Sequence, residues 1–200
     1  MSGGCRDLTS DNLFLLRFKK LLDSNVLAEA FLHVFYSKEW NVKGLSVDAL
    51  SVEESYQIQD LVCEKRVAGG ERVVGYKVGC TSHAIRSQFR LTEPISGRLF
   101  APHVQAEGLP IDWRGYANCA IEPEMVFFTG CDLFGTDFSD RELIDAINYV
   151  SPGIELHHYH FWHQPPSLQE LICSGGIHAG LIVGNSCLLY TSDAADDGLS

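Results

Sequence analysis

The stretch that decides the fold is Ile121-Glu122-Pro123-Glu124-Met125-Val126-Phe127-Phe128. Its apolar and aromatic content predicts a β-strand. Side chains of a strand alternate between its two faces, so Glu122 and Glu124 share one face with Val126 and Phe128. The two carboxylates then lie about 6.7 Å apart along the strand. At an effective dielectric constant of about 20 their repulsion is roughly 2 kcal/mol, and desolvation of either group adds to it.

Two explanations of this acidic face remain open from these eight residues. A cation between the carboxylates would offset their repulsion, and a hard divalent ion such as Mg²⁺ or Mn²⁺ prefers oxygen ligands. Alternatively, the segment is an edge strand whose acidic face meets solvent, because Pro123 is tolerated on an edge and costs a ladder hydrogen bond elsewhere. The remainder of the chain shifts the balance towards the cation.

Composition excludes several classes of protein. The chain has 200 residues, enough for one domain with a sizeable core, and its 46% hydrophobic content is ordinary for a globular protein. A net charge of −11 argues against a nucleic-acid surface, which needs clustered Lys and Arg. Neither a secretory signal pattern nor an apolar run long enough for a membrane span is expected. The seven cysteines lack Cys-x-x-Cys spacing, which favours a cytoplasmic protein and disfavours a cysteine-rich zinc site.

The N-terminal part of the chain is predicted to be helical. Residues 11–36 carry apolar side chains on more than one face, as one long helix or as two helices with a break near Ser24-Asn25. Such a segment is expected to pack across the domain or against another subunit, which predicts a homo-oligomer. A second helix begins near Ser51, which can form a capping box with Glu54, and ends at Gly69-Gly70.

Two basic side chains lie where a ligand could approach. Residues 72–82 contain a β-branched strand interrupted by glycines, which often mark a close approach of the backbone, and Lys77 lies between two of them. The alternative for Lys77 is a surface lysine on an edge strand. Residues 92–101 are predicted to be a turn and a loop, in which Arg98 either contacts an anion or is solvated.

A third acid follows on a later segment. A helix is predicted over Asp140–Val150, ending before Pro152. Residues 153–157 then form a short strand in which Glu155 is flanked by Ile and Leu. If that strand lies beside the first, Glu155 completes a three-carboxylate site; otherwise it is an outward-facing acid on a half-buried strand. The helix is expected to bury Leu143, Ile144 and Ile147.

Histidines near this strand suggest zinc, but their spacing disfavours it. His157 and His158 would face opposite sides of a strand, and the aromatic residues around His160 and His163 indicate a packed loop. Residues 167–173 are predicted to form one or two helical turns, followed by a buried strand over residues 177–184. His178 in that strand is expected to be a core histidine with satisfied hydrogen bonds, although it stays of interest because of the resemblance described below.

The chain is expected to divide into three parts. Residues 1–70 form an N-terminal helical region and residues 71–185 a catalytic domain. Residues 186–200 resemble a translated sequencing-library adapter and are expected to lie outside the fold. The catalytic domain is then expected to be incomplete at its C-terminal end.

Four motifs follow one another in the chain: Gly75-Tyr-Lys-Val-Gly-Cys-Thr-Ser82, Glu93-Pro-Ile-Ser-Gly-Arg-Leu-Phe-Ala101, Ile121-Glu-Pro-Glu124 and Pro152-Gly-Ile-Glu155. In this order they resemble the fumarylacetoacetate hydrolase superfamily, and within it the 2-keto-4-pentenoate hydratase and 4-oxalocrotonate decarboxylase branch. The resemblance extends from about Leu50 to Gly184. It implies an α+β fold with a mixed β-sandwich roll, and a divalent metal, Mg²⁺ or Mn²⁺, held by Glu122, Glu124 and Glu155. It also implies that Lys77 is the active-site lysine.

The activity implied is a metal-dependent hydratase, a lyase that adds water to a small 2-oxo or 2-hydroxydienoic acid such as 2-hydroxypenta-2,4-dienoate. Lys77 would assist as a charge or a proton-transfer group, and Thr81, Ser82 and Arg98 would orient the acid. The alternatives are a 2-oxo acid decarboxylase, a C–C hydrolase, or a non-catalytic relative that only oligomerises. The chain departs from the hydratases at residues 174–179, where they usually carry an Asp-Asn-Ala-Ser-like stretch.

Overall fold

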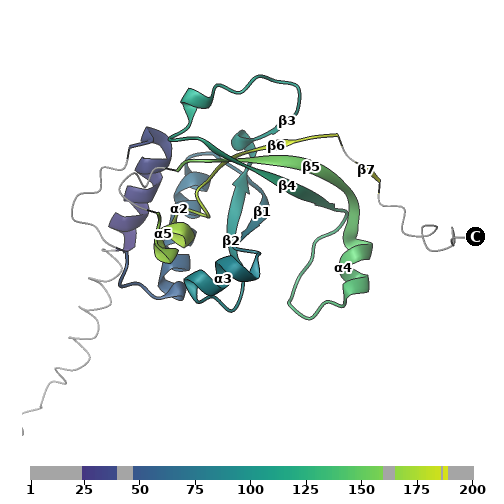
Figure 1. The fold of residues 1–200 in the computed structure, drawn as a ribbon, viewed down its shortest axis with the longest axis horizontal. Coiled ribbons are helices and arrows are strands. Elements are labelled where there is room, and N and C mark those ends of the chain that lie inside the picture. Colours follow the sequence, from purple (N-terminus) through teal and green to yellow (C-terminus); the bar gives the residue numbers. More distant parts are fainter. Residues whose placement is uncertain (1–23, 40–46, 160–164, 186, 189–200) are drawn as a thin grey trace, which may run out of the picture.

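The fold is a mixed α+β arrangement of two sheets and several helices, which confirms the predicted class. The computed structural model describes residues 24–39, 47–159, 165–185 and 187–188. The helices and strands are α2 (Val52–Ala68), β1 (Val73–Gly79), α3 (His83–Phe89), β2 (Ile95–Phe100), η1 (Ala101–His103), β3 (Val104–Ala106), η2 (Trp113–Gly115), β4 (Ala120–Thr129), α4 (Asp140–Ala146), β5 (Ile147–His157), α5 (Leu168–Cys173), β6 (His178–Val183) and β7 (Cys187–Leu188). Figure 1 shows β4, β5 and β6 side by side across the molecule, with α2 and α5 together at one end.

The helical end of the molecule contains an apolar core. Residues 24–37 form a helix, so this part of the predicted 11–36 helix is confirmed, while residues 11–23 lie outside the described residues. The Ser51 hydroxyl accepts from the Glu54 N–H and the Glu54 carboxylate accepts from the Ser51 N–H, which confirms the capping box of α2. Burial of aliphatic and aromatic side chains holds these helices to α5. The core residues are Leu27, Ala28, Phe31, Val47, Ile58 and Cys173.

The smaller sheet corrects one prediction. Residues 92–101, predicted to be a turn and a loop, contain strand β2, which pairs antiparallel with β1 and places Lys77 opposite Gly97. A Cβ atom at Gly97 would lie 2.4 Å from the carbonyl oxygen of Gly175. Ser96-Gly97, which resembles a turn in sequence, therefore lies within a strand. The glycine is needed there because the backbone of Gly175 approaches closely.

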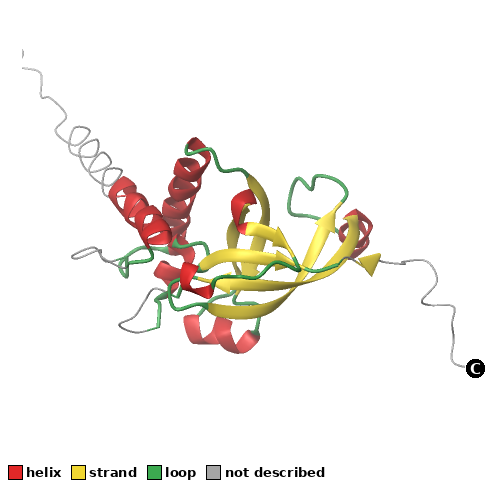
Figure 2. Ribbon diagram, turned by 90° about the horizontal axis from the view of Figure 1, so that it is seen from above, coloured by secondary structure: helices red, strands yellow, loops and turns green. Residues whose placement is uncertain are grey.

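The larger sheet has the order β3-β6-β5-β4, and β7 also pairs with β5. β3 and β6 are parallel, whereas β6, β5 and β4 are antiparallel. β4 ends this strand order, as expected for a strand that contains Pro123. Its register pairs Glu122 with Glu155 and Glu124 with Gly153. Seen from above, the strands form one block between the main group of helices and the short helix α4 (Figure 2).

The prediction of a helix over Asp140–Val150 is wrong in the length of the helix and in which of its residues are buried. α4 ends at Ala146, and residues from Ile147 onward belong to the long strand β5. Leu143 and Ile144 are exposed rather than buried. Tyr149 pairs with Phe128 in the ladder, and the two rings stack with their centroids 4.4 Å apart. Pairing with β4 therefore overrides the local helical pattern, because strand preference depends on cross-strand packing.

The C-terminal elements largely match their predictions. α5 begins with a capping box between Ser167 and Glu170, and β6 covers most of the predicted strand 177–184. α3 was not indicated by the sequence patterns; the Ser82 hydroxyl caps it by accepting from the Ile85 N–H. Within the described part of the chain, none of the helices combines the length and apolar character needed to cross a bilayer.

Candidate metal centre

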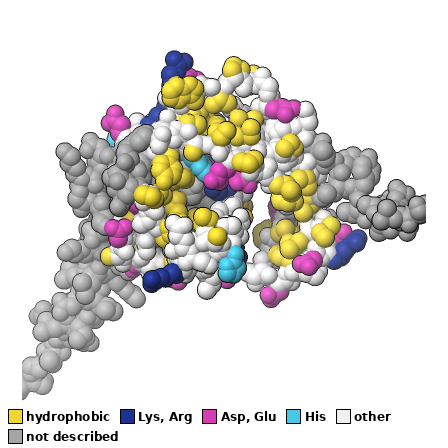
Figure 3. All heavy atoms as spheres, in the orientation of Figure 1, with side chains coloured by type: hydrophobic (Ala, Val, Ile, Leu, Met, Phe, Trp, Pro, Cys, Tyr) yellow, Lys and Arg dark blue, Asp and Glu magenta, His cyan; other side chains and the backbone are white. Residues whose placement is uncertain are grey.

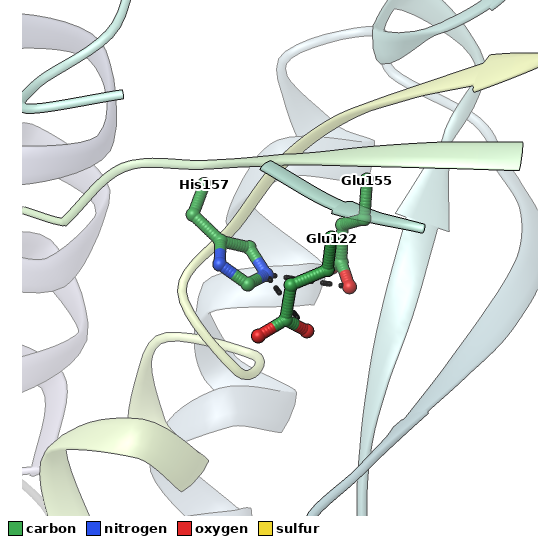
Figure 4. A group of neighbouring side chains, drawn as sticks. All are labelled: Glu122, Glu155 and His157. Carbon is green, nitrogen blue, oxygen red and sulfur yellow. Dashed lines mark ion pairs between the residues drawn. The ribbon is translucent and has the colours of Figure 1, made fainter. Parts of the chain in front are cut away.

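An acidic cluster forms where β4 and β5 pair. Glu122 lies directly opposite Glu155, and directly opposed side chains of an antiparallel pair share a face. His157 follows Glu155 by two residues and therefore shares that face as well. Its Nε2 lies 3.3 Å from Glu155 Oε2 and 3.9 Å from Glu122 Oε2. Figure 4 shows the three side chains converging from the two strands.

Glu155 is the centre of this cluster. Its side chain is 3% exposed, and it lies 3.0 Å from Lys77 Nζ and 2.7 Å from His178 Nδ1. β1 thus carries Lys77 to β5, and the Lys77 ammonium also donates to the Gly176 carbonyl at 3.5 Å. Burial alone would raise the pKa of Glu155, but the two neighbouring imidazoles and the charge of Lys77 outweigh it, so that pKa lies well below its usual range.

His178 positions Glu155 from β6. Burial lowers the pKa of His178 more than the adjacent carboxylate raises it, so the imidazole is neutral at physiological pH. In that state the ring donates Nδ1–H to Glu155, which leaves Nε2 as an acceptor. A cavity of about 30 Å³, bordered by His178 and Arg66, is large enough for one water molecule. His178 is buried as expected, and its hydrogen-bond partner is a predicted metal ligand. Its hydrogen bonds are not all satisfied, because Nε2 has no partner among the described residues.

The remaining predicted acid, Glu124, lies on the same face of β4 as Glu122. Burial, and then repulsion by Glu155 and Glu122, raise the pKa of Glu124 above its usual value. This agrees with the sequence argument that the acidic face is electrostatically unfavourable without a cation. Glu124 does not, however, belong to the compact group of potential ligand atoms, which Glu122, Glu155 and His157 supply within 4.8 Å of one another.

A divalent ion fits this donor set. Three carboxylates face a single nearby ammonium, that of Lys77, so the described cluster has an excess of negative charge. Carboxylate oxygens are the ligands that Mg²⁺ and Mn²⁺ prefer. In addition, Nε2 of His157 is buried 3.3 Å from Glu155 Oε2 and makes no well-aligned hydrogen bond with any of the described residues. Figure 3 shows acidic side chains in the middle of the face in view, with hydrophobic side chains around them.

Of the three predicted substrate contacts, Ser82 and Arg98 have other partners for their side chains, and Thr81 has one for its backbone carbonyl. Ser82 caps α3, and the Thr81 carbonyl accepts from the Arg86 guanidinium. Arg98 lies 2.6 Å from Asp60 and donates to Gln59 at 3.2 Å. Their roles towards a substrate stay predictions, whereas Lys77, Glu122 and Glu155 are brought together.

His157 is the residue whose place at this site the sequence argument missed. The spacing of His157 and His158 was used to disfavour a site of several histidines, and their opposite orientation is confirmed. His158 Nδ1 accepts from the Ala117 N–H at 3.1 Å, away from the acids. The same alternation, counted from Glu155, puts His157 on the acidic face, and this signal was present in the sequence. His160 and His163 lie outside the described residues.

Comparison with known proteins identifies relatives that are similar in sequence. No protein-family model matches the chain. A 4-oxalocrotonate decarboxylase from a Pseudomonas species is 32% identical over 137 residues, which cover 68% of this chain and 53% of the relative. A 2-keto-4-pentenoate hydratase from Paraburkholderia xenovorans is 32% identical over 109 residues, covering 54% of this chain and 40% of the relative. The chain therefore spans about half the length of the curated relatives it matches, or less.

A solved structure of a protein with one of these names has a similar fold. It is a 4-oxalocrotonate decarboxylase from Pseudomonas putida G7 complexed with magnesium and adipate, with a TM-score of 0.76 and 22% identity. The match covers 83% of this chain and 64% of that one. Sequence relatives, fold and the order of the acidic motifs agree, and the chain belongs to the 2-keto-4-pentenoate hydratase and 4-oxalocrotonate decarboxylase branch of the fumarylacetoacetate hydrolase superfamily.

Proposed function

We propose that the protein is a divalent-metal-dependent hydro-lyase that adds water to a small 2-oxo or 2-hydroxydienoic acid, such as 2-hydroxypenta-2,4-dienoate. The observation that carries this proposal is the convergence of exposed Glu122 and largely buried Lys77, from two other strands, on buried Glu155. Relatives named as hydratases support the reaction class. Acids of this kind arise when aromatic rings are opened, so the protein would act in the breakdown of aromatic compounds.

The metal would be Mg²⁺ or Mn²⁺, held by Glu122, Glu124 and Glu155. Bound there, the ion supplies a Lewis acid and a template for the carboxylate and 2-oxygen of the substrate. Glu155 is the most strongly positioned ligand, because Lys77 on β1 contacts one of its carboxylate oxygens and His178 on β6 contacts the other. Each carboxylate oxygen has a further lone pair, so these contacts leave Glu155 able to bind an ion.

Lys77 would stabilise the negative charge that develops on the substrate when it tautomerises. Its side chain is 12% exposed, so its charge acts in a region of little water, where electrostatic stabilisation is strongest. A side chain at Gly176 would crowd it, since a Cβ atom there would lie 3.0 Å from Nζ, and the φ of +76° also favours glycine. Thr81, Ser82 and Arg98 would orient the acid after leaving their present partners.

The second candidate is decarboxylation of a 2-oxo acid, or hydrolysis of a C–C bond, at the same metal. Decarboxylation is favoured by the 4-oxalocrotonate decarboxylases among the relatives and solved structures. Both candidates use the same ligand set, because each needs the chelated 2-oxo acid. Product analysis with a 2-hydroxydienoate and with 4-oxalocrotonate separates them: hydration yields the 4-hydroxy-2-oxo acid, whereas decarboxylation releases CO₂.

Calorimetric titration of the chain with Mg²⁺ and Mn²⁺ tests the metal site directly. We expect saturable binding that Glu124→Ala abolishes or strongly weakens, and that Glu64→Ala leaves unchanged, because Glu64 is an exposed acid on α2 away from the cluster. A folded wild-type chain that binds neither ion would contradict the proposal of a metal-dependent lyase. The protein would then be interpreted as a non-catalytic relative.

We further propose a homo-oligomer that works in the cytoplasm. The face of β4 opposite the acids exposes Ile121, Met125 and Phe127 by 65%, 64% and 53%. A contiguous apolar strand face of this kind commonly marks an interface. Cys63, Cys80, Cys119, Cys131 and Cys173 are all free, as expected in a reducing compartment. Sedimentation equilibrium tests the assembly, and a monomer at micromolar concentration would contradict it.

A further inference from the structure

We propose that the cavity between α2 and the start of β6 binds one water molecule, which accepts a hydrogen bond from the Arg66 guanidinium and donates one to His178 Nε2. Arg66 is then a positioning residue, because the water fixes the imidazole tautomer that donates Nδ1–H to Glu155. This positioning role rests on the proposed metal site, of which Glu155 is a ligand. The water site itself does not depend on whether a metal binds.

The donor is Arg66, whose guanidinium is held rigidly. Its Nε lies 2.7 Å from Glu71 Oε2, and the ring centroids of Phe35 and Phe100 lie 4.2 and 3.7 Å from its central carbon. Arg66 borders the cavity and is 7% exposed. Its Nη2 has no hydrogen-bond partner among the described residues. A guanidinium always keeps its protons, so this buried group calls for an acceptor.

The acceptor is Nε2 of His178, which borders the same cavity and is 5% exposed. Nδ1 of this ring lies 2.7 Å from Glu155 Oε1, and an ionised carboxylate can only accept, so Nδ1 carries the proton. The neutral imidazole then has its lone pair on Nε2. This atom too lacks a partner within the part of the chain that the structure describes, so it does not bond to Nη2 of Arg66 directly.

The other polar side chains around the cavity already have partners. The Gln59 amide donates to two backbone carbonyls, and its oxygen accepts from Arg98. The Ser174 hydroxyl donates to a backbone carbonyl at 3.1 Å and accepts from a backbone N–H at 3.2 Å. The Cys173 thiol donates to a backbone carbonyl at 3.6 Å. Among the described side chains that line the cavity, the buried nitrogen and oxygen atoms left unpaired are therefore one donor and one acceptor.

Water suits this pair of atoms better than an ion does. The cavity of about 30 Å³ has room for a water molecule, which can accept from Nη2 and donate to Nε2. An anion would face the lone pair of Nε2, and the charge of Arg66 is already balanced by Glu71. A second cavity of the same volume borders Arg66 and the histidine as well, but its lining is mainly apolar and includes Phe31 and Phe35.

The water transmits the orientation of Arg66 to Glu155. Because a guanidinium only donates, the water accepts from Arg66 and turns a hydrogen towards His178. A donor facing Nε2 excludes the tautomer that carries its proton there, and so keeps the proton on Nδ1, towards Glu155. Hydrogen-bond partners just beyond the ligands commonly set the orientation and the affinity of a metal site.

The first test is a high-resolution crystal structure of the full-length chain prepared without metal, together with long-range ¹H–¹⁵N NMR spectra of its histidines. We expect one ordered water within hydrogen-bonding distance of Arg66 Nη2 and His178 Nε2. The spectra should show a His178 ring that is protonated at Nδ1 alone. The wild-type structure and spectrum decide the water site even where a variant does not fold.

Arg66→Met tests the positioning role, since it removes the donor and keeps an aliphatic side chain. The His178 tautomer protonated at Nε2 should then appear in the spectrum, and the affinity for Mg²⁺ should fall about threefold to tenfold. The matched control is Glu71→Gln, which breaks the ion pair of the guanidinium but leaves Nη2 in place. It should destabilise the chain, while the tautomer of His178 stays that of the wild type.

The outcomes separate this inference from the proposed function. A cavity without an ordered water, an anion located there by the anomalous signal of soaked bromide, or a wild-type ring protonated at Nε2 would overturn the water site. An unchanged tautomer in folded Arg66→Met, or the same change in Glu71→Gln, would overturn the positioning role. Failure of the wild type to bind Mg²⁺ with the water in place would instead contradict the proposed metal function and leave the water site standing.

Discussion

Replacing Lys77 by methionine removes the charge beside Glu155 and keeps most of the aliphatic side chain. At 3.0 Å and an effective dielectric constant of about 20, the attraction between the two charges is about 5 kcal/mol before desolvation is subtracted. The two side chains are 12% and 3% exposed, so solvent screens them little. Removing one partner of a buried pair typically costs about 3–5 kcal/mol. Because His178 still donates to Glu155, we expect a loss near the lower limit, about 3 kcal/mol.

Urea unfolding in the presence of a chelator measures this loss without interference from bound metal. The matched control is Lys65→Met, which breaks a pair of the same chemistry at 2.6 Å to Glu29, whose side chain is 62% exposed. An exposed pair contributes at most about 1 kcal/mol. For a chain of this size, the loss of about 3 kcal/mol expected for Lys77→Met corresponds to a fall in Tm of roughly 6–12 °C.

Equal destabilisation by the two substitutions would refute the reasoning, because it would mean that Glu155 is not held by Lys77 in solution. A double-mutant cycle adds a stricter criterion. The pair Lys77→Met and Glu155→Gln should be less destabilising together than the sum of the two alone, by about 1.5 kcal/mol or more. Strict additivity would contradict a direct interaction.

Three further outcomes are expected. Gly97→Ala should lower the free energy of unfolding by about 1–3 kcal/mol, because its Cβ would lie 2.4 Å from the Gly175 carbonyl, while Gly115→Ala, with open space around it, should be close to neutral in the same urea titration. Ser51→Ala should cost about 1 kcal/mol by removing the cap of α2, and Ser51→Asp should restore it; a helix that melts no earlier without the cap would count against the capping box. Burial raises the pKa of the Cys173 thiol to about 12, so at pH 8 iodoacetamide should label exposed Cys131 and leave Cys173 unmodified until urea unfolds the chain, as peptide mass spectrometry would show.

Local patterns were sufficient to predict several elements and the faces of their side chains. The capping box predicted at Ser51 needs only residues three apart, so the start of α2 can be recognised in the sequence. The structure shows the same local pattern at Ser139 and Ser167, where α4 and α5 begin. The twofold alternation of strands is equally local. It places Glu122 with Glu124 on one face of β4, and Glu155 with His157 on one face of β5.

Only the tertiary structure decided which of these faces meet. Lys77, Glu155 and His178 come from β1, β5 and β6, and no local rule gives the register that pairs Glu122 with Glu155. Residues 147–150 illustrate the same limit, since their helical pattern yields to pairing with β4. The physical reason is that strand formation and the pKa of a buried acid both depend on contacts between residues distant in sequence, whose energies exceed local preferences of a few tenths of a kcal/mol per residue. The chain therefore specifies its candidate ligands locally and assembles them into a site only by folding.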